Sequence, residues 1–375
     1  MTTRTTLGLL ALAGLLASPS GLAGCKPDGV TTWAEVSYPW ATQHADIDGT
    51  KVAYADLGQG ERTLVLIHGL GSYGPVWKNN AESLAQHHRV IVLDLPGYGR
   101  SDKPPAPYSM TYFAQNVHAL LAELDVRDPV LVGHSMGGQI AMTYALKYPD
   151  EYAALVLTSP AGFEEFEDGE AKWLANAVTP AFTCAADDEA VYVRTAGNFH
   201  RMPKDAKFMV DDRIATKTSP DFPDYCVAVS RSVAGMLDEP VYAQLPEIAK
   251  PVLVLFGKHD NLIPNPFLHG GSTVRLAEEA VARLPDADLV VLPRAGHMAQ
   301  FEAADAWNAE VERFVSRLPA ADASAPATAP AAPTGARAPS EPEPDSEASP
   351  PVVQPPAEDP IEADEPTEIA EEPVP

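Results

Sequence analysis

Residues 133–138 read Gly-His-Ser-Met-Gly-Gly, and their flanks make them the most constraining feature of this chain. The apolar run at 129–132 before them is typical of a buried strand, and residues 139–147 after them are typical of a helix. A serine between a strand and a helix, with glycine on both sides, requires a strained turn at which backbone segments pack closely. The short pattern recurs by chance, so we predict a nucleophile elbow at Ser135 only together with the further signals below.

Strand-like apolar runs alternate with helix-like amphipathic stretches along most of the chain. The strand-like runs are residues 63–67, 89–93, 129–134, 154–157, 252–256 and 289–292. The helix-like stretches are residues 77–86, 111–124, 139–148, 273–284 and 303–318. Continuous apolar runs suit strands that are buried on both faces of a parallel sheet, and Asp48-Gly49 between residues 45–47 and 52–55 predicts an antiparallel hairpin at the start. We therefore expect an α/β fold with a doubly wound, mostly parallel sheet.

Residues 161–246 interrupt this alternation with helical pieces, several prolines and no strand-like run. We predict a helical lid there, lying over the carboxyl ends of the strands, where ligands bind in open α/β sheets. The core is then formed by residues 44–160 and 247–318. The phenylalanine and tryptophan residues of the lid are Phe163, Phe166, Trp173, Phe182, Phe199, Phe208 and Phe222. We expect most of them to form the lid's own small core and two or three to face a substrate.

A serine nucleophile needs a base to take its proton, an acid to orient that base, and donors for the oxyanion. His297 is the candidate base, because it follows the last strand-like run and precedes a helix. This places it on a loop at the carboxyl edge of the sheet. Among the other nine histidines, His259 is the strongest rival, but it adjoins Asp260 on a loop that suits the acid better.

Asp260 is the candidate acid, because it comes directly after the strand-like run at 252–256. An aspartate at such a place also commonly caps a turn or a helix, which is the alternative interpretation. The other position for an acid is one strand earlier, where residues 158–160 read Thr-Ser-Pro and offer no carboxylate.

Two main-chain amides are the candidate oxyanion donors. One belongs to Met136, which follows the serine, and the other to Leu70, which follows His68-Gly69 at the end of an earlier strand-like run. We expect His68 to brace this loop. The alternative for residues 68–71 is a simple glycine turn.

Residues 94–102 read Asp-Leu-Pro-Gly-Tyr-Gly-Arg-Ser-Asp. This segment resembles the Asp-x-Pro-Gly-x-Gly-x-Ser loop of α/β-hydrolases, and with the segments above the resemblance covers residues 44–318. It implies the chain order nucleophile, acid, histidine, which the three candidates follow. It also implies structural roles for Asp94 and Asp102. The resemblance is specific for the fold and the triad but not for the substrate, since this fold hosts many reactions.

The residue at the nucleophile position excludes some of the reactions that this family catalyses. Haloalkane dehalogenase-like and epoxide hydrolase-like members of the family carry Asp where this chain has Ser135. The chain also lacks the Gly-Gly-x-Trp-Gly elbow of proline iminopeptidase-like members. We predict a carboxylesterase or lipase that acts on a small ester through an acyl-serine intermediate. Neither a cofactor nor a metal is expected, because the histidines lack a ligand spacing such as His-x-x-x-His. A cofactor-free perhydrolase, a carbon–carbon or amide hydrolase, and a non-catalytic binding lipoprotein remain open.

The first 24 residues have the pattern of an export signal. Arg4 precedes an apolar stretch at 7–17 that is too short to span a bilayer, and Leu-Ala-Gly leads to Cys25. This resembles the bacterial lipobox, which implies a lipid on Cys25 and a tether over residues 25–43. Lys26 after the cysteine favours the outer membrane by resemblance to enterobacterial sorting. An ordinary signal peptide or a short membrane anchor is the alternative.

The C-terminal segment differs in composition from the rest. Residues 319–375 hold 15 prolines and 13 acidic residues against one basic residue, Arg337, and they contain no aromatic residue. Such a segment buries too little apolar surface to fold, so we expect an extended tail. The chain's net charge of −26, of which the tail supplies a large share, argues against nucleic-acid binding. The tail is either a solvated spacer or a docking segment for a basic partner in the cell envelope.

Cys184 and Cys226 remain as a pair if Cys25 is lipidated. In an exported protein such a pair is a candidate disulfide, and two buried free thiols are the alternative.

Overall fold

A computed structural model describes residues 32–320. The predicted signal peptide, Cys25 and residues 321–375 of the acidic tail lie outside the described residues. None of the helices within 32–320 has the length and apolar character that crossing a membrane requires.

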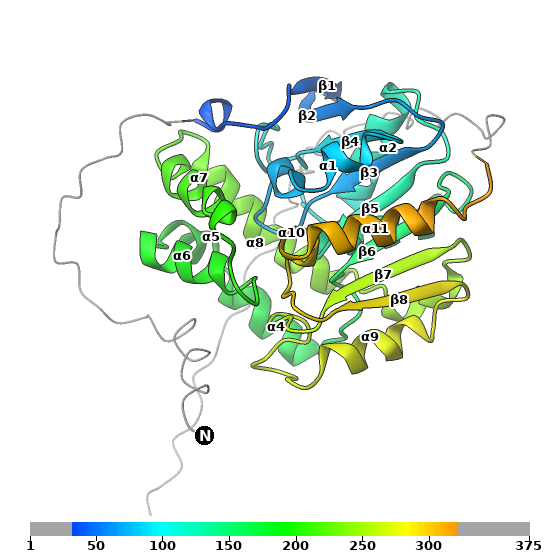
Figure 1. Cartoon of the computed structure of the whole chain (residues 1–375). Coiled ribbons are helices and arrows are strands. Elements are labelled where there is room, and N and C mark those ends of the chain that lie inside the picture. Colours follow the sequence, from blue (N-terminus) through cyan, green and yellow to red (C-terminus); the bar gives the residue numbers. More distant parts are fainter. Residues whose placement is uncertain (1–31, 321–375) are drawn as a thin grey trace, which may run out of the picture. The chain divides into compact units, whose positions relative to one another are not determined.

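Eight strands form one sheet in the order β1-β2-β4-β3-β5-β6-β7-β8. The strands are β1 (Gln43–Ile47), β2 (Thr50–Leu57), β3 (Thr63–Ile67), β4 (Arg89–Leu93), β5 (Val130–His134), β6 (Ala154–Thr158), β7 (Val252–Gly257) and β8 (Ala287–Leu292). The β1–β2 and β2–β4 pairs are antiparallel, and every other pair is parallel. This confirms the doubly wound, mostly parallel sheet with its antiparallel start (Figure 1).

Helices cover both faces of the sheet because its central strands are apolar on both sides. On β3, Val65 and Ile67 face the layer formed by α2 (Met110–Glu123), α3 (Met136–Lys147) and α9 (Thr273–Val281). The alternate residues, Leu64 and Leu66, face the layer formed by α1 (Ala81–Leu84) and α11 (Ala304–Val315). Period-two burial on both faces is what a continuous apolar run in a strand produces.

The helix expected over residues 77–86 is shorter in the structure. A 3₁₀ turn, η3 (Gly74–Trp77), is followed by the single helical turn of α1. The buried Asn80 side chain lies between them and donates to Gln300 O and Asn308 Oδ1, each at 2.8 Å. These tertiary hydrogen bonds hold Asn80 between the two turns. The continuous helix that the apolar spacing suggested is therefore interrupted there.

The segment between β6 and β7 is helical, as predicted for the lid, and contains no strand (Figure 1, green). Its elements are α4 (Asp168–Ala177), α5 (Pro180–Cys184), α6 (Asp188–Ala196), η4 (Lys204–Ala206), α7 (Phe208–Thr216), α8 (Phe222–Asp238) and η5 (Tyr242–Glu247). The helix α10 (Ala299–Glu302) lies after β8 and precedes α11.

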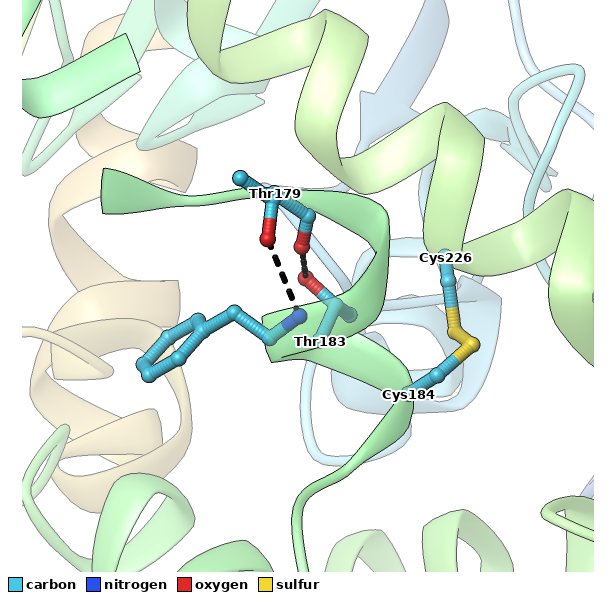
Figure 2. The surroundings of a disulfide bond; sticks show 5 residues. Thr179, Thr183, Cys184 and Cys226 are labelled. Atoms are coloured by element: carbon cyan, nitrogen blue, oxygen red, sulfur yellow. Dashed lines mark hydrogen bonds between the residues drawn. A yellow bond between two sulfur atoms is a disulfide. The ribbon is translucent and has the colours of Figure 1, made fainter. Parts of the chain in front are cut away.

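A disulfide joins Cys184 at the end of α5 to Cys226 in α8, with a Cα–Cα distance of 5.7 Å. Figure 2 shows that α5 begins with its own cap, in which Thr179 Oγ1 accepts the Phe182 N–H at 3.1 Å. Because α5 is only five residues long and has no buried residue, it gains its place in the lid largely from this covalent link to the long helix α8.

The boundary expected for the N-terminal tether needs correction. The 3₁₀ turn η2 (Trp33–Glu35) places Trp33 in the core at 3% exposure, in ring contact with Tyr73 and Tyr225. Val36 is buried as well. Residues from Trp33 onward therefore belong to the folded part. The apolar side chains of Trp33 and Val36 pack in the core, and the sequence pattern before residue 44 did not indicate this.

Candidate active site

Ser135 lies at the turn between β5 and α3 with a backbone φ of 54°. A non-glycine residue rarely adopts this left-handed region, so the turn is strained. The neighbouring glycines permit it by close packing: a Cβ on Gly133 would lie 2.3 Å from Gly137 O, and a Cβ on Gly137 would lie 2.3 Å from Ile67 O. The elbow geometry predicted from the sequence is therefore present.

His297 and Asp260 meet although they follow different strands. His297 comes after β8 and Asp260 after β7, and the Nδ1 of His297 lies 2.9 Å from Asp260 Oδ2. Both side chains are almost fully buried, at 4% and 0% exposure. Because a carboxylate accepts, Nδ1 carries the proton and donates it, which leaves Nε2 of the neutral ring as an acceptor.

Asp260 also serves the turn in which it lies. Its Oδ1 accepts the N–H groups of Leu262 at 2.9 Å and Ile263 at 3.2 Å. The turn-capping alternative is thus correct for one oxygen, while the other oxygen holds His297. The rival His259 instead stacks on His200 of the lid, with ring centroids 4.0 Å apart.

A cavity of about 640 Å³ lies over these residues and is lined by Ser135, His297 and Leu70. Most of the rest of its wall comes from the lid, from residues 161–175 and 233–240, and from the loop at 262–265. Of the seven phenylalanine and tryptophan residues of the lid, Phe166 alone lines this cavity. The expectation that two or three would do so was wrong, because side chains such as Phe163 turn into the core instead, where Phe163 packs on Phe256.

The loop that carries Leu70 is held by His68. The ring accepts the Leu95 N–H at Nε2 (3.0 Å), so Nδ1 carries the proton and donates to Gly69 O at 2.8 Å. Complete burial lowers the pKa of His68, which keeps the ring neutral and this pairing intact. Leu70 lies on the cavity wall and Met136 is the first residue of α3, so both amides lie close to the serine turn. Within residues 32–320, neither amide has a main-chain partner.

A family model for the alpha/beta hydrolase fold matches residues 62–304, and this range contains the elbow, Asp260 and His297. The chain belongs to the α/β-hydrolase family.

Known proteins similar to this α/β-hydrolase carry diverse names. A 2-hydroxy-6-oxononadienedioate/2-hydroxy-6-oxononatrienedioate hydrolase of Burkholderia vietnamiensis is 31% identical over 72% of this chain and 93% of its own length. The dihydrolipoyllysine-residue acetyltransferase component of the acetoin cleaving system of Cupriavidus necator is 30% identical over 73% of this chain and 69% of its own length. A crystal structure of "a probable hydrolytic enzyme" from Pseudomonas aeruginosa superposes with a TM-score of 0.69 at 25% identity, covering 76% of this chain and 97% of that one.

Asp94 and Asp102 in the loop at residues 94–102 have structural roles, as the resemblance of this loop to that of α/β-hydrolases implied. Asp94 accepts from Tyr38 Oη (2.6 Å), Gly74 N (2.6 Å) and Arg100 N (2.8 Å). Asp102 accepts the Lys51 N–H at 2.8 Å. These bonds tie the loop to β2 and to η3.

Sequence reasoning missed several lid residues that brace the loops carrying Leu70 and His297. From α7 and α8, the Arg213 guanidinium and the Tyr225 hydroxyl both donate to Gly71 O, in the loop that carries Leu70. On the histidine side, Glu302 accepts the N–H groups of Gly296, His200 and Arg201 at 2.6–2.9 Å. No sequence signal marks the contacts made by the lid, since these partners lie about a hundred residues apart or more.

The elbow histidine, His134, lies behind the pair. Its Nε2 donates to His297 O at 3.1 Å, and the two rings are 4.8 Å apart. Burial, together with the nearby His297, holds the pKa of His134 well below its usual value. His134 is therefore a neutral support for the His297 loop.

Among residues 32–320, no group of three or more His, Cys, Asp or Glu side chains is arranged to hold a metal ion.

Proposed function

We propose that this α/β-hydrolase cleaves carboxylic esters through an acyl-serine intermediate, with Ser135, His297 and Asp260 as nucleophile, base and acid. One observation carries the proposal: Ser135 on its strained elbow and the buried, Asp260-bonded His297 line one cavity. A nucleophile, an oriented base and amide donors in one enclosed site are what acyl transfer requires.

In the first half-reaction, Ser135 Oγ attacks the ester carbonyl carbon and its proton moves to His297 Nε2. Asp260 stabilises the resulting imidazolium through the 2.9 Å contact with Nδ1. The carbonyl oxygen becomes an oxyanion, which the amides of Leu70 and Met136 bind. When the C–O bond to the alcohol breaks, His297 returns the proton to the leaving oxygen, and the acyl group stays on Ser135.

In the second half-reaction, water takes the place of the alcohol. His297 removes a proton from the water as it attacks the acyl carbon, the same amides bind the second oxyanion, and the proton returns to Ser135 Oγ as the carboxylic acid leaves. The Ser135 hydroxyl has no hydrogen-bond partner within residues 32–320. Catalytic hydrogen bonds of this kind often tighten only when substrate is bound.

Carbon–carbon bond hydrolysis is the second candidate, because the relative from Burkholderia vietnamiensis is named for it. That name specifies a dicarboxylate substrate. The cavity of this protein instead contains a buried carboxylate of its own, Glu164, whose side chain is 8% exposed. Like charges repel strongly in such surroundings, so ester hydrolysis is favoured.

The test is hydrolysis of p-nitrophenyl esters from acetate to palmitate by the purified chain and its Ser135→Ala variant. We expect turnover that the variant loses by about 10³-fold or more, as expected for loss of a nucleophile. Activity that survives in the folded variant would overturn the assignment of Ser135. An inactive wild-type protein that instead cleaves a carbon–carbon substrate would support the second candidate.

We further propose that the protein acts at the bacterial cell envelope, anchored by a lipid on Cys25, with the outer membrane favoured. The support is the sequence pattern around Cys25 alone. Labelled palmitate fed to expressing cells should enter the wild-type protein and not a Cys25→Ser variant. Equal labelling of both would contradict the anchor.

For the acidic tail, the proposed role is a spacer or a docking segment for a basic envelope partner. Deleting residues 319–375 should leave ester hydrolysis unchanged, because the described wall of the cavity is formed by residues between Leu70 and His297. Loss of envelope retention in the same deletion would favour docking, and unchanged retention would favour a spacer.

A further inference from the structure

Glu164 is a buried carboxylate in the wall of the cavity that contains Ser135 and His297. It follows β6 and precedes α4, and its side chain is 8% exposed. The other charged residues on the wall are exposed: Asp168, Lys172 and Asp238. Water screens those three, whereas Glu164 acts in a medium of low effective dielectric.

The two oxygens of Glu164 have different surroundings. Its Oε1 accepts the Asn265 N–H at 2.6 Å and is 2.6 Å from Nδ1 of His269. The hydrogen bonds of this side chain within residues 32–320 involve Oε1 and not Oε2. Because Oε2 is not among the fully buried atoms without a partner, it keeps access to water or to a ligand and can accept a donor that arrives with the substrate.

The position of Glu164 is fixed rather than adaptable. Asn265 lies in the loop after Asp260, and His269 contacts both Glu164 and Glu170, the latter at 3.1 Å from Nε2. The ring of Phe166, also on the cavity wall, lies 5.2 Å from that of His269. This network holds Oε1 in place and leaves Oε2 without a protein donor on a residue of the cavity wall, which is the preorganisation that selective binding requires.

We propose that Glu164 selects the substrate: its free oxygen accepts a hydrogen bond from a hydroxyl or ammonium group of the ester, and its charge rejects esters that carry a carboxylate. This inference rests on the proposed ester hydrolysis and narrows its substrate class. Lys172 does not reverse the selection, because its ammonium is exposed on α4 and screened by solvent.

The experiment compares esters of one chain length that differ in charge. On the acyl side, these are p-nitrophenyl hexanoate, mono-p-nitrophenyl adipate and the p-nitrophenyl esters of ω-hydroxy- and ω-aminohexanoic acid. On the alcohol side, hexanoylcholine is compared with the hexanoate ester of the neutral alcohol in which a carbon atom replaces the choline nitrogen. Proton release measures both reactions. On at least one side, we expect kcat/KM for the cationic or hydroxylated ester to exceed that for the neutral ester. We expect kcat/KM for the adipate ester to be about tenfold lower than that for the hexanoate.

Glu164→Gln should remove this discrimination, chiefly by raising kcat/KM for the adipate ester about tenfold relative to the hexanoate. The matched control is Glu170→Gln, which alters the other carboxylate bonded to His269 but not the cavity wall. We expect it to keep the wild-type selectivity. Activity on the neutral hexanoate shows that each variant is folded.

Equal selectivity in the wild-type protein and Glu164→Gln would overturn the inference, as would wild-type indifference to charge on both sides of the ester. The second result decides the matter even if Glu164→Gln does not fold. A loss of selectivity in Glu170→Gln equal to that in Glu164→Gln would assign the effect to the His269 network and also overturn it. Failure of the ester mechanism itself is separate, because it shows as activity that is absent or independent of Ser135.

Discussion

The carboxylate of Glu302 accepts the main-chain N–H of Gly296, the residue before His297, with an Oε2···N distance of 2.8 Å. The same side chain accepts from His200 and Arg201 of the lid. A Cβ on Gly296 would lie 2.5 Å from His200 N, so the lid turn and the histidine loop are in direct contact. The position of His297 therefore depends on the lid as well as on β8.

Glu302→Ala should reduce kcat on p-nitrophenyl esters by about 10- to 100-fold with little change in KM, because a small displacement of His297 affects proton transfer more than substrate binding. Glu302→Gln, which keeps one accepting oxygen, should recover part of the loss. Steady-state kinetics measure both effects. The control is Glu310→Gln, which changes an exposed ion pair with Arg313 on α11. A rise in KM without a fall in kcat would contradict a positioning role for Glu302.

Asp260→Asn should lower kcat by about 10³- to 10⁴-fold, because an amide in place of Oδ2 favours the wrong tautomer of His297 and no longer stabilises its charged form. The turn should survive, since the remaining oxygen can still accept from Leu262 and Ile263. Circular dichroism should therefore match the wild-type protein. If the variant kept near-normal kcat, the acid would have to be another residue.

Removing the disulfide should destabilise the lid. Replacing Cys184 and Cys226 together by serine releases a loop of about 43 residues, for which the chain-entropy model gives about 4 kcal/mol as an upper figure. We expect a lower midpoint of thermal unfolding and faster proteolysis around α5 (Pro180–Cys184). Limited proteolysis followed by mass spectrometry locates the cuts. An unchanged melting temperature and unchanged cutting would show that α5 is held by other contacts.

Acid should destabilise the folded protein through two histidines. Burial lowers the pKa of both His68 and His134, so below the unfolded value of about 6.5 the unfolded chain binds protons that the folded chain does not. The stability that their neutral forms contribute is complete above that pH and is lost as the pH falls toward the folded pKa values. The expected slope is about 1.4 kcal/mol per pH unit for each histidine.

Urea unfolding between pH 5 and pH 8 measures this slope. His134→Gln, whose amide can still donate to His297 O, should flatten it, while a change at the exposed His44 should leave it unchanged. A slope that stays the same in His134→Gln would mean that other groups titrate in this range.

The sequence by itself determined the sheet and the order of the catalytic candidates. Runs such as residues 252–256 are apolar at every position, which suits a strand buried on both faces, and all six predicted runs are strands in the structure. The loops that follow parallel strands all emerge at one edge. Candidates that follow strand ends, such as Asp260 and His297, therefore meet there even though 37 residues separate them.

Only the tertiary structure decided how the lid meets this edge. The helical pattern of residues 161–246 indicates an apolar face on each helix but not the neighbour that each face contacts. Phe166 and Glu164 on the cavity wall, Arg213 on the Gly71 carbonyl, and Glu302 on the His200 N–H are consequences of packing between segments far apart in the chain. Local periodicity carries no information about such contacts, because they depend on how short helices with few buried residues pack against the sheet.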